Sequence, residues 1–343
     1  MDEQIIIRIA ESYGVKFKRL LPSEKGYRNE SFPIVTNSGK IINLIIYKRE
    51  PSIVHTIHNA NRTSNFLADH GLPSRHTLDP RIICLSSGSW RKYAGLYNYL
   101  PGQTIPWVAY TRQHIRLLGA MLSNLHAELK TLSIDGYPAV AEQYYRLLRA
   151  IKEYITQPSV GTAIKSKLGL KINQEYLNNN LLLLKACQRL KYQQVLHMDF
   201  VRSNILFESK LSGKSQSNLA ICGVLDFEKT AYGHPLFDIA RSLAFLLVDC
   251  KYKTNQQVRK YFLYSGYQKR GSNRLPHVKL NNSIWSSDLL ERLLDIFLTY
   301  DFYKFLKHNP YESLIDNEHY QRTRDLLLSR KVIYWIGDTI NLN

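Results

Sequence analysis

Residues 195–207 read Val-Leu-His-Met-Asp-Phe-Val-Arg-Ser-Asn-Ile-Leu-Phe, and residues 223–228 read Gly-Val-Leu-Asp-Phe-Glu. In each stretch a short apolar run, typical of a buried strand, is followed by polar side chains where the strand would end. A rigid scaffold often presents functional side chains to a ligand at such places. The spacing His197-x-Asp199-x4-Asn204 puts a carboxylate and an amide on one tight loop.

These residue types suit the transfer of a phosphoryl group to a hydroxyl. Such a reaction needs a base that orients the attacking hydroxyl, hard oxygen ligands for one or two Mg²⁺ ions, and a cation beside the phosphates. Asp199, Asn204 and Asp226, which ends the second apolar run, supply the base and the oxygen ligands. The alternative is that His197, Asp199 and Asn204 only form turns and cap strands.

The rest of the chain predicts an α+β protein with two lobes. A length of 343 residues suits two lobes or domains. Strand-like patterns dominate the first 100 residues, around one main helix at 52–70, and helical patterns dominate the remainder. We therefore predict a small N-terminal sheet lobe (1–98) and a large, mostly helical lobe (99–343), with the boundary between Asn98 and Gln103.

Caps, alternation and turn residues predict the individual elements. A first helix runs from Asp2, an acidic N-cap, to Tyr13 and stops at Gly14. Strands are predicted at 15–21, 32–36, 41–48, 81–85 and 90–99, with a turn at Lys25–Gly26 and a hairpin at 37–40. Further helices are predicted at roughly 111–130, 138–156, 173–190, 235–249, 254–268, 283–307 and 318–336. The polar stretch 209–218 is predicted to be an exposed loop.

The chain is strongly basic, with a formal net charge of +18. Basic proteins attract nucleic acids, anionic membranes or phosphorylated ligands. Here the excess is spread along the chain without a run of five or six Lys and Arg residues, so a general attraction for phosphates is favoured over a nucleic-acid partner. No apolar run approaches the ~18–20 residues of a membrane span, and no membrane partner is expected.

The cysteines and the first residues indicate a cytoplasmic protein. The chain begins Met-Asp-Glu-Gln, which is neither a signal nor a transit peptide. The four cysteines lie far apart without a CxxC pair, as expected of reduced, buried thiols (Cys84, Cys187, Cys222 and Cys250).

The pair of motifs His-x-Asp-x4-Asn and Leu-Asp-Phe-Glu resembles the aminoglycoside phosphotransferase and choline kinase superfamily, relatives of the protein kinases. The resemblance covers about residues 15–250 and implies a bilobal protein-kinase-like fold. It implies that Asp199 is the catalytic base and that Asn204 and Asp226 hold Mg²⁺.

Other residues match supporting parts of the same family. The resemblance implies that His197 braces the catalytic loop, and that Asp238 of the segment Gly-His-Pro-Leu-Phe-Asp supports this loop from behind. Glu228 of Asp-Phe-Glu is expected to be a further structural support. Residues 118–126 (Leu-Gly-Ala-Met-Leu-Ser-Asn-Leu-His) resemble the helix that precedes the catalytic region.

Lys48 is the predicted cation beside the α- and β-phosphates. The even-numbered residues of the strand 41–48 are apolar and end in Lys48, so alternation places this lysine on the inward face. Arg49, or an ordinary lysine at a strand end, is the alternative. The relatives pair this lysine with a helix glutamate, which the helix 52–70 lacks, and either Asn59 or Asn61 is expected to replace it.

Other nucleotide contacts rest on the resemblance alone. Residues 26–34 (Gly-Tyr-Arg-Asn-Glu-Ser-Phe-Pro-Ile) resemble the family's nucleotide loop, with Gly-x-x-Asn where protein kinases have several glycines. Asn29 and Ser31 are therefore expected to lie over the phosphates, although a plain β-turn would look similar. Tyr97 and Tyr99, just before Leu-Pro-Gly, resemble the hinge whose backbone binds adenine.

The resulting hypothesis is a kinase that uses ATP or GTP with Mg²⁺ and phosphorylates a hydroxyl of a small molecule. The helical regions 138–190 and 283–336 are expected to wall the acceptor pocket. Aminoglycoside, choline-like amino alcohol, homoserine-like and sugar acceptors all remain open. A cationic acceptor would prefer the acids of the last region (Asp288, Glu291, Asp295 and Asp301), whose spacing also fits a solvated helix face. The alternatives are a nucleotide-binding pseudokinase and a basic nucleic-acid-binding protein.

Overall fold

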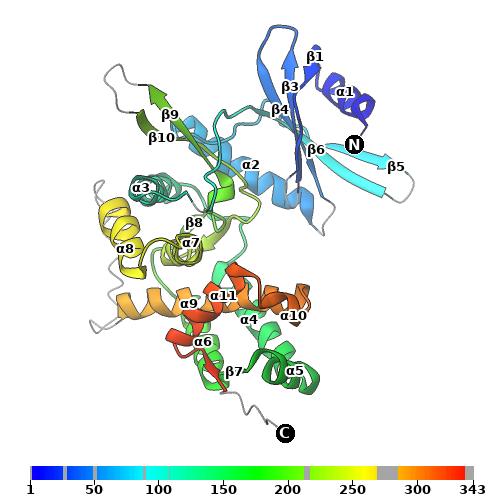
Figure 1. Cartoon of the computed structure of the whole chain (residues 1–343). Coiled ribbons are helices and arrows are strands. Elements are labelled where there is room, and N and C mark those ends of the chain that lie inside the picture. The colour runs from blue at the N-terminus through cyan, green and yellow to red at the C-terminus, as the bar shows by residue number, and fades with distance from the viewer. Residues whose placement is uncertain are drawn as a thin grey trace. The chain divides into compact units, whose positions relative to one another are not determined.

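A computed structural model of the chain describes residues 2–25, 29–48, 52–87, 90–107, 109–211, 217–268 and 285–336. The chain forms two compact units (Figure 1). The first unit comprises Met1–Ile105 and Arg202–Thr230, and the second comprises Pro106–Val201 and Ala231–Asn343. Gly26 of the predicted turn and Arg49 lie outside the described residues.

An antiparallel sheet of six strands forms most of the first unit. Its order is β1-β3-β4-β6-β5, with β2 paired to β3 outside this path. The strands are β1 (Phe17–Leu20), β2 (Glu24–Lys25), β3 (Asn29–Thr36), β4 (Ile41–Tyr47), β5 (Ile83–Ser87) and β6 (Trp90–Asn98). All five predicted strands are present. β3 begins three residues earlier because Asn29–Ser31 already pair with β4, and β5 lies two residues later than predicted. β2 was not predicted, and it includes Lys25, which was predicted to lie in a turn.

Two helices cover opposite faces of this sheet (Figure 1). The even-numbered apolar residues of β4 pack in one cluster with helix α1 (Glu3–Ser12). Ile45 and Tyr47 pack in another cluster with helix α2 (Ile53–Asp69). Because β4 is buried on both faces, alternation of apolar residues does not identify one inward face.

A second antiparallel hairpin of the first unit lies between Asn204 and Asp226. The turn η1 (Arg202–Asn204) leads into β9 (Ile205–Leu211), which pairs with β10 (Ser217–Val224). The prediction of an exposed loop over 209–218 was therefore wrong at both ends. Cross-strand pairing there overrides a local composition that favours turns.

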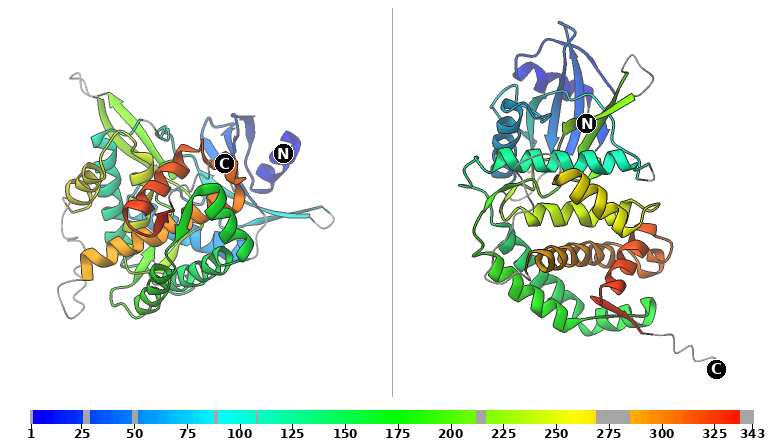
Figure 2. Two further views of the ribbon diagram at one scale, coloured as in Figure 1. Left: turned by 60° about the horizontal axis from the view of Figure 1, so that its bottom comes forward. Right: turned by 90° about the vertical axis from the view of Figure 1, so that its left-hand side faces the viewer.

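Helices make up most of the second unit, and α9 packs against both α7 and α4 (Figure 2). The helical segments are α3 (Arg112–Leu129), α4 (Val140–Ile155), α5 (Pro158–Leu168), α6 (Gln174–Cys187), α7 (Leu236–Asp249), α8 (Asn255–Arg259), the π-helical η2 (Lys260–Tyr267), α9 (Trp285–His308), α10 (Tyr311–Leu314) and α11 (Glu318–Ser329). All predicted helices are present, whereas α5 and α10 were not predicted.

Two short strand pairs complete the second unit. β8 (Gln194–Leu196) pairs with β11 (Ala231–Gly233), and β7 (Leu170–Ile172) pairs with β12 (Ile333–Trp335). The predicted helix 318–336 therefore ends too late, because its last residues join a strand from a distant part of the chain.

The α+β prediction is confirmed: a sheet-bearing unit is accompanied by a mostly helical one. None of the helices in the described ranges has the length and apolar character needed to cross a bilayer. The prediction of buried thiols holds for Cys187 and Cys250, whereas Cys84 is exposed and Cys222 is half-buried.

Candidate active site

The loop His197–Asp199 follows β8 and is anchored through its backbone. The two carboxylate oxygens of Asp238 accept hydrogen bonds from the backbone N–H groups of His197 (2.8 Å) and Met198 (2.9 Å). Met198 has a left-handed conformation (φ 61°), which costs a residue with a side chain roughly 1–2 kcal/mol. The two hydrogen bonds to Asp238 offset this strain and fix the turn that carries Asp199.

Asp238 is in turn held by a residue of α3. Its Oδ2 lies 3.2 Å from Nε2 of His126, whose Nδ1 lies 2.7 Å from the hydroxyl of Tyr267. Burial acts to raise the pKa of Asp238, but the hydrogen bond and the charge of His126 hold it below its usual value. Asp238 therefore stays ionised, and its charge strengthens the bonds to the loop. Sequence analysis did not single out His126, although it ends the segment 118–126.

The side chain of His197 makes contacts within the loop itself. Its side chain is fully buried, and its Nδ1 accepts a hydrogen bond from the backbone N–H of Asp199 at 3.2 Å. Its ring also meets that of Phe200 edge-on, with the centroids 5.9 Å apart. These contacts shape the turn and orient Asp199, which is itself buried.

Charged and aromatic side chains of α4, α7 and α9 form the electrostatic surroundings of Asp199 within the second unit. Arg241 binds Asp301 through two nitrogens (2.7 and 3.2 Å) and lies 4.0 Å from the ring centre of Phe245. Burial acts to lower the pKa of Arg241, but Asp301 and, more weakly, Asp199 keep it raised. Burial raises the pKa of Tyr144, and Asp199 adds to this effect. Asp199 thus lies near a permanent cation and a neutral hydroxyl.

In the first unit, the segments that carry Asn204 and Asp226 are tied together. The backbone N–H of Leu225 donates to the carbonyl of Asn204 (2.8 Å), and that of Val224 donates to the carbonyl of Pro73 (2.7 Å). Asp226 itself has a left-handed conformation (φ 58°). The structure thus brings Asn204 and Asp226 to adjoining strand ends, whereas Asp199, five residues before Asn204, belongs to the second unit.

Glu228, two residues after Asp226, forms a buried ion pair with Arg75. Their side chains are each 5% exposed, and Nη2 of Arg75 lies 3.1 Å from Oε1 of Glu228. Burial acts to raise the pKa of Glu228, but the Arg75 guanidinium outweighs it and the pKa is lowered. The carboxyl group of Glu228 also contacts that of Asp226. The sequence gives no local signal for Arg75, which lies between α2 and β5 outside regular secondary structure.

The chemistry of these side chains fits a Mg²⁺ ion. Asn204 and Asp226 offer hard oxygen ligands, and Oε2 of Glu228 is buried without a hydrogen-bond partner among the described residues. The described residues contain no group of three or more His, Cys, Asp or Glu side chains that would hold a metal by themselves. In proteins Mg²⁺ is usually bound by one or two carboxylates together with substrate phosphates.

The residues predicted to contact the nucleotide lie in the strands of the first unit or directly after them. Asn29 and Ser31 lie in β3, where the hydroxyl of Ser31 donates to Oδ1 of Asn43 (2.8 Å). Lys48 directly follows β4 and is exposed, while the strand face that α2 covers ends in Tyr47.

A hydrogen-bonded group of buried side chains lies between this strand face and α2. The hydroxyl of Tyr97 lies 2.6 Å from that of Tyr47 and donates to Oδ1 of Asn61 (2.9 Å). This oxygen of Asn61, one of the two expected substitutes for the helix glutamate, thus bonds a tyrosine. Tyr99, by contrast, is half-buried.

The model of the phosphotransferase enzyme family matches residues 20–257, more than half of the chain. The chain belongs to this family. The resemblance drawn from the two motifs is thereby confirmed, and both motifs lie inside the matched region of this phosphotransferase. No curated protein matches the sequence.

Solved structures of several kinases share the fold of this phosphotransferase. The amicoumacin kinase hAmiN, in complex with AMP-PNP and Ca²⁺, is 13% identical with a TM-score of 0.66, covering 95% of this chain and 94% of its own. A microcompartment-associated aminopropanol kinase is 11% identical with a TM-score of 0.64, covering 96% and 99%. The aminoglycoside 2'-phosphotransferase-IIIa, in complex with GDP, is 15% identical with a TM-score of 0.56, covering 96% and 97%. At such identities the likeness concerns the fold, and it confirms the kinase-like prediction.

Three of the four acids suggested for a cationic acceptor are engaged in ion pairs. Glu291 binds Arg259 (2.9 Å) and Arg330 (3.0 Å), and Asp295 binds Arg330 as well. Asp301 binds Arg241, as described above. These carboxylates of the phosphotransferase are thus largely neutralised by its own arginines.

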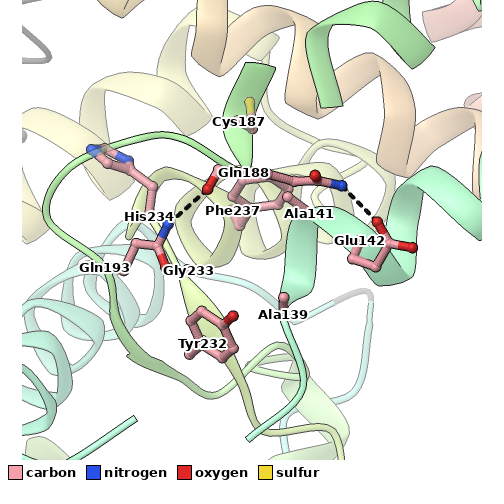
Figure 3. Close-up of a pocket in the computed structure, with 10 residues that line it drawn as sticks. All are labelled: Ala139, Ala141, Glu142, Cys187, Gln188, Gln193, Tyr232, Gly233, His234 and Phe237. Carbon is pink, nitrogen blue, oxygen red and sulfur yellow. Dashed lines mark hydrogen bonds between the residues drawn. The ribbon is translucent and has the colours of Figure 1, made fainter. Parts of the chain in front are cut away.

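A pocket of about 220 Å³ lies in the second unit, lined by residues of α4, α6, β11 and α7 (Figure 3). Nε2 of Gln188 donates to Glu142 (2.6 Å), and Nε2 of Gln193 donates to the carbonyl of Gln188 (3.3 Å). Figure 3 shows Glu142 and His234 at opposite ends of this pocket. His234 is buried, and its Nδ1 accepts a hydrogen bond from the backbone N–H of Leu236 (3.3 Å).

His234 makes the stability of the phosphotransferase depend on pH. Burial, aided by the nearby His126, lowers the pKa of His234 from 6.5 to about 4. The unfolded chain therefore binds a proton that the folded chain excludes, and stability is lost as pH falls from about 6.5 toward 4. At about 1.4 kcal/mol per pKa unit, we expect a loss of about 3 kcal/mol.

The measurement is urea unfolding at pH 7 and pH 4.5. His234→Asn should reduce the loss of unfolding free energy between pH 7 and pH 4.5. Its amide oxygen still accepts a hydrogen bond from the Leu236 N–H but takes up no proton. His308→Asn, at an exposed position, is the control. Equal pH dependence in His234→Asn and the native protein would contradict the assignment.

Proposed function

We propose that this phosphotransferase transfers the γ-phosphoryl group of ATP or GTP, with Mg²⁺, to a hydroxyl of a small molecule. The observation that supports this most is the double hydrogen bond from the backbone of His197 and Met198 to Asp238. It holds a strained turn in one conformation, and the residue so presented is the carboxylate Asp199. A backbone arrangement of this cost is retained at functional sites.

In the proposed reaction, Asp199 accepts the proton of the acceptor hydroxyl. The hydroxyl oxygen forms a bond to the γ-phosphorus as the bond to the bridging β–γ oxygen breaks, and the nucleoside diphosphate leaves. Asn204 and Asp226 would hold Mg²⁺, which neutralises phosphate charge when bound. Arg241 adds a fixed positive charge near Asp199.

Lys48 is proposed to contact the α- and β-phosphates of the nucleotide. Asn29 and Ser31 would lie over the phosphates, and the backbone of Tyr97–Tyr99 would bind the nucleobase. Lys48→Ala should then weaken nucleotide binding about 10–100-fold, because a hydrogen bond to a charged group contributes about 1.5–3 kcal/mol. Arg49→Ala removes the adjacent charge and should change binding little. Titration with a fluorescent nucleotide measures both variants, and equal losses would mean that Lys48 acts only through general charge.

The acceptor is proposed to bind along α4 and α9. Because Glu291, Asp295 and Asp301 are paired with arginines, this surface offers few carboxylates for a polycation. This supports a small amino alcohol, a homoserine-like compound or a sugar over an aminoglycoside.

A panel of such hydroxyl compounds tests the proposal. Each is incubated with purified protein, Mg²⁺ and either ATP or GTP, and phosphorylated product is detected by ³¹P NMR. At least one acceptor is expected to gain a phosphate ester. Product in none of them, from protein that binds nucleotide, would favour the alternative of a nucleotide-binding protein without turnover. One observation supports this alternative: the amide oxygen of Asn61, one of the two residues expected to replace the helix glutamate, accepts a hydrogen bond from the hydroxyl of Tyr97.

A further inference from the structure

A continuous series of contacts joins helix α2 to the turn that carries Asp226, all within the first unit. It starts at Asn61, whose Oδ1 accepts a hydrogen bond from the hydroxyl of Tyr97 at 2.9 Å. The guanidinium of Arg75 lies over the ring of Tyr97, 4.4 Å from its centre. Arg75 then binds Glu228 at 3.1 Å, and the carboxyl group of Glu228 contacts Asp226.

The segment that carries Arg75 also holds this turn through the backbone. The carbonyl of Pro73 accepts a hydrogen bond from the backbone N–H of Val224 at 2.7 Å, and Ser74 forms a β-bridge with Val224. Asp226 is thus constrained on both sides, by backbone bonds two residues before it and by the Arg75–Glu228 pair two residues after it. Such double constraint suits a side chain whose position must be precise.

The Arg75–Glu228 pair is not arranged for stability alone. Burying two charges is expensive unless their remaining hydrogen-bonding atoms are satisfied. Here Nε of Arg75 and Oε2 of Glu228 are buried without hydrogen-bond partners among the described residues. The planar guanidinium does what lysine cannot, because it stacks on the Tyr97 ring and binds the carboxylate at the same time.

We propose that Arg75 is a positioning residue for the cation-binding turn. By holding Glu228 against Asp226, it sets the orientation of the Asp226 carboxylate and couples it to α2. This inference rests on the proposed function, since it assumes that Asp226 binds the cation.

The test measures cation binding directly rather than turnover. Mn²⁺, in the presence of the non-hydrolysable AMP-PNP, is titrated by electron paramagnetic resonance. Arg75→Met should lower Mn²⁺ affinity 10–100-fold, the usual effect of removing a residue that orients a metal ligand. Arg81→Met, which breaks the exposed pair with Asp79 in the same unit, should leave it unchanged.

Two further variants separate positioning from folding. Arg75→Met combined with Glu228→Gln leaves no unpaired buried charge, so it should melt near the native temperature and yet bind Mn²⁺ weakly. Arg75→Lys keeps the charge without the planar group and should recover only part of the affinity. Native Mn²⁺ affinity in a folded double variant overturns the inference while the proposed function stands. Absence of Mn²⁺ binding in the native protein overturns both.

Discussion

Asp199→Asn is expected to keep the fold and nucleotide binding but to lower kcat about 10²–10⁴-fold. This is the range that a positioned general base contributes, and asparagine cannot accept the acceptor's proton. The fold should survive because the loop is held by backbone bonds to Asp238, which the substitution leaves in place. KM for the nucleotide should change little, since the role proposed for Asp199 involves the acceptor.

The assay uses the best acceptor of the panel, with single-turnover kinetics to isolate the chemical step. Asp325→Asn, an exposed aspartate of α11, is the matched control and should be fully active. Activity of Asp199→Asn within a fewfold of the native protein would remove this residue from the mechanism.

The second large effect concerns stability in the presence of nucleotide. A ligand at about 100 times its dissociation constant stabilises the folded state by about 2.7 kcal/mol, which should raise the melting temperature by several degrees. Asp226→Ala should abolish the part of this increase that depends on Mg²⁺ and leave the part that nucleotide gives alone. The reason is that this carboxylate is the proposed link between the cation and the protein.

Differential scanning fluorimetry with ATP or GTP, each with and without Mg²⁺, gives the four values needed. Asp69→Ala, at a largely exposed carboxylate of the same unit, controls for the loss of a negative charge. A full Mg²⁺-dependent increase in Asp226→Ala would place the cation elsewhere, and no increase with either nucleotide in the native protein would count against a kinase.

Sequence alone determined the features that depend on neighbouring residues. The acidic cap of α1 at Asp2 accepts the N–H of Gln4 at 3.0 Å, as a helix start should. Asn204 and Asp226 likewise adjoin the apolar runs that the sequence shows, at paired strand ends. Periodicity and capping act over a few residues, so they can be read directly from the chain.

Tertiary structure alone decided the contacts between distant residues. Arg75 meets Glu228 across 153 positions, and His126 meets Asp238 across 112. Likewise, only the pairing of β12 with β7 ended the last predicted helix. Three of the four acids of α9 form ion pairs with arginines that lie elsewhere in the sequence. The local sequence does not indicate such partners. Their interaction matters only when the fold buries both side chains, because a charge removed from water is costly unless it is paired.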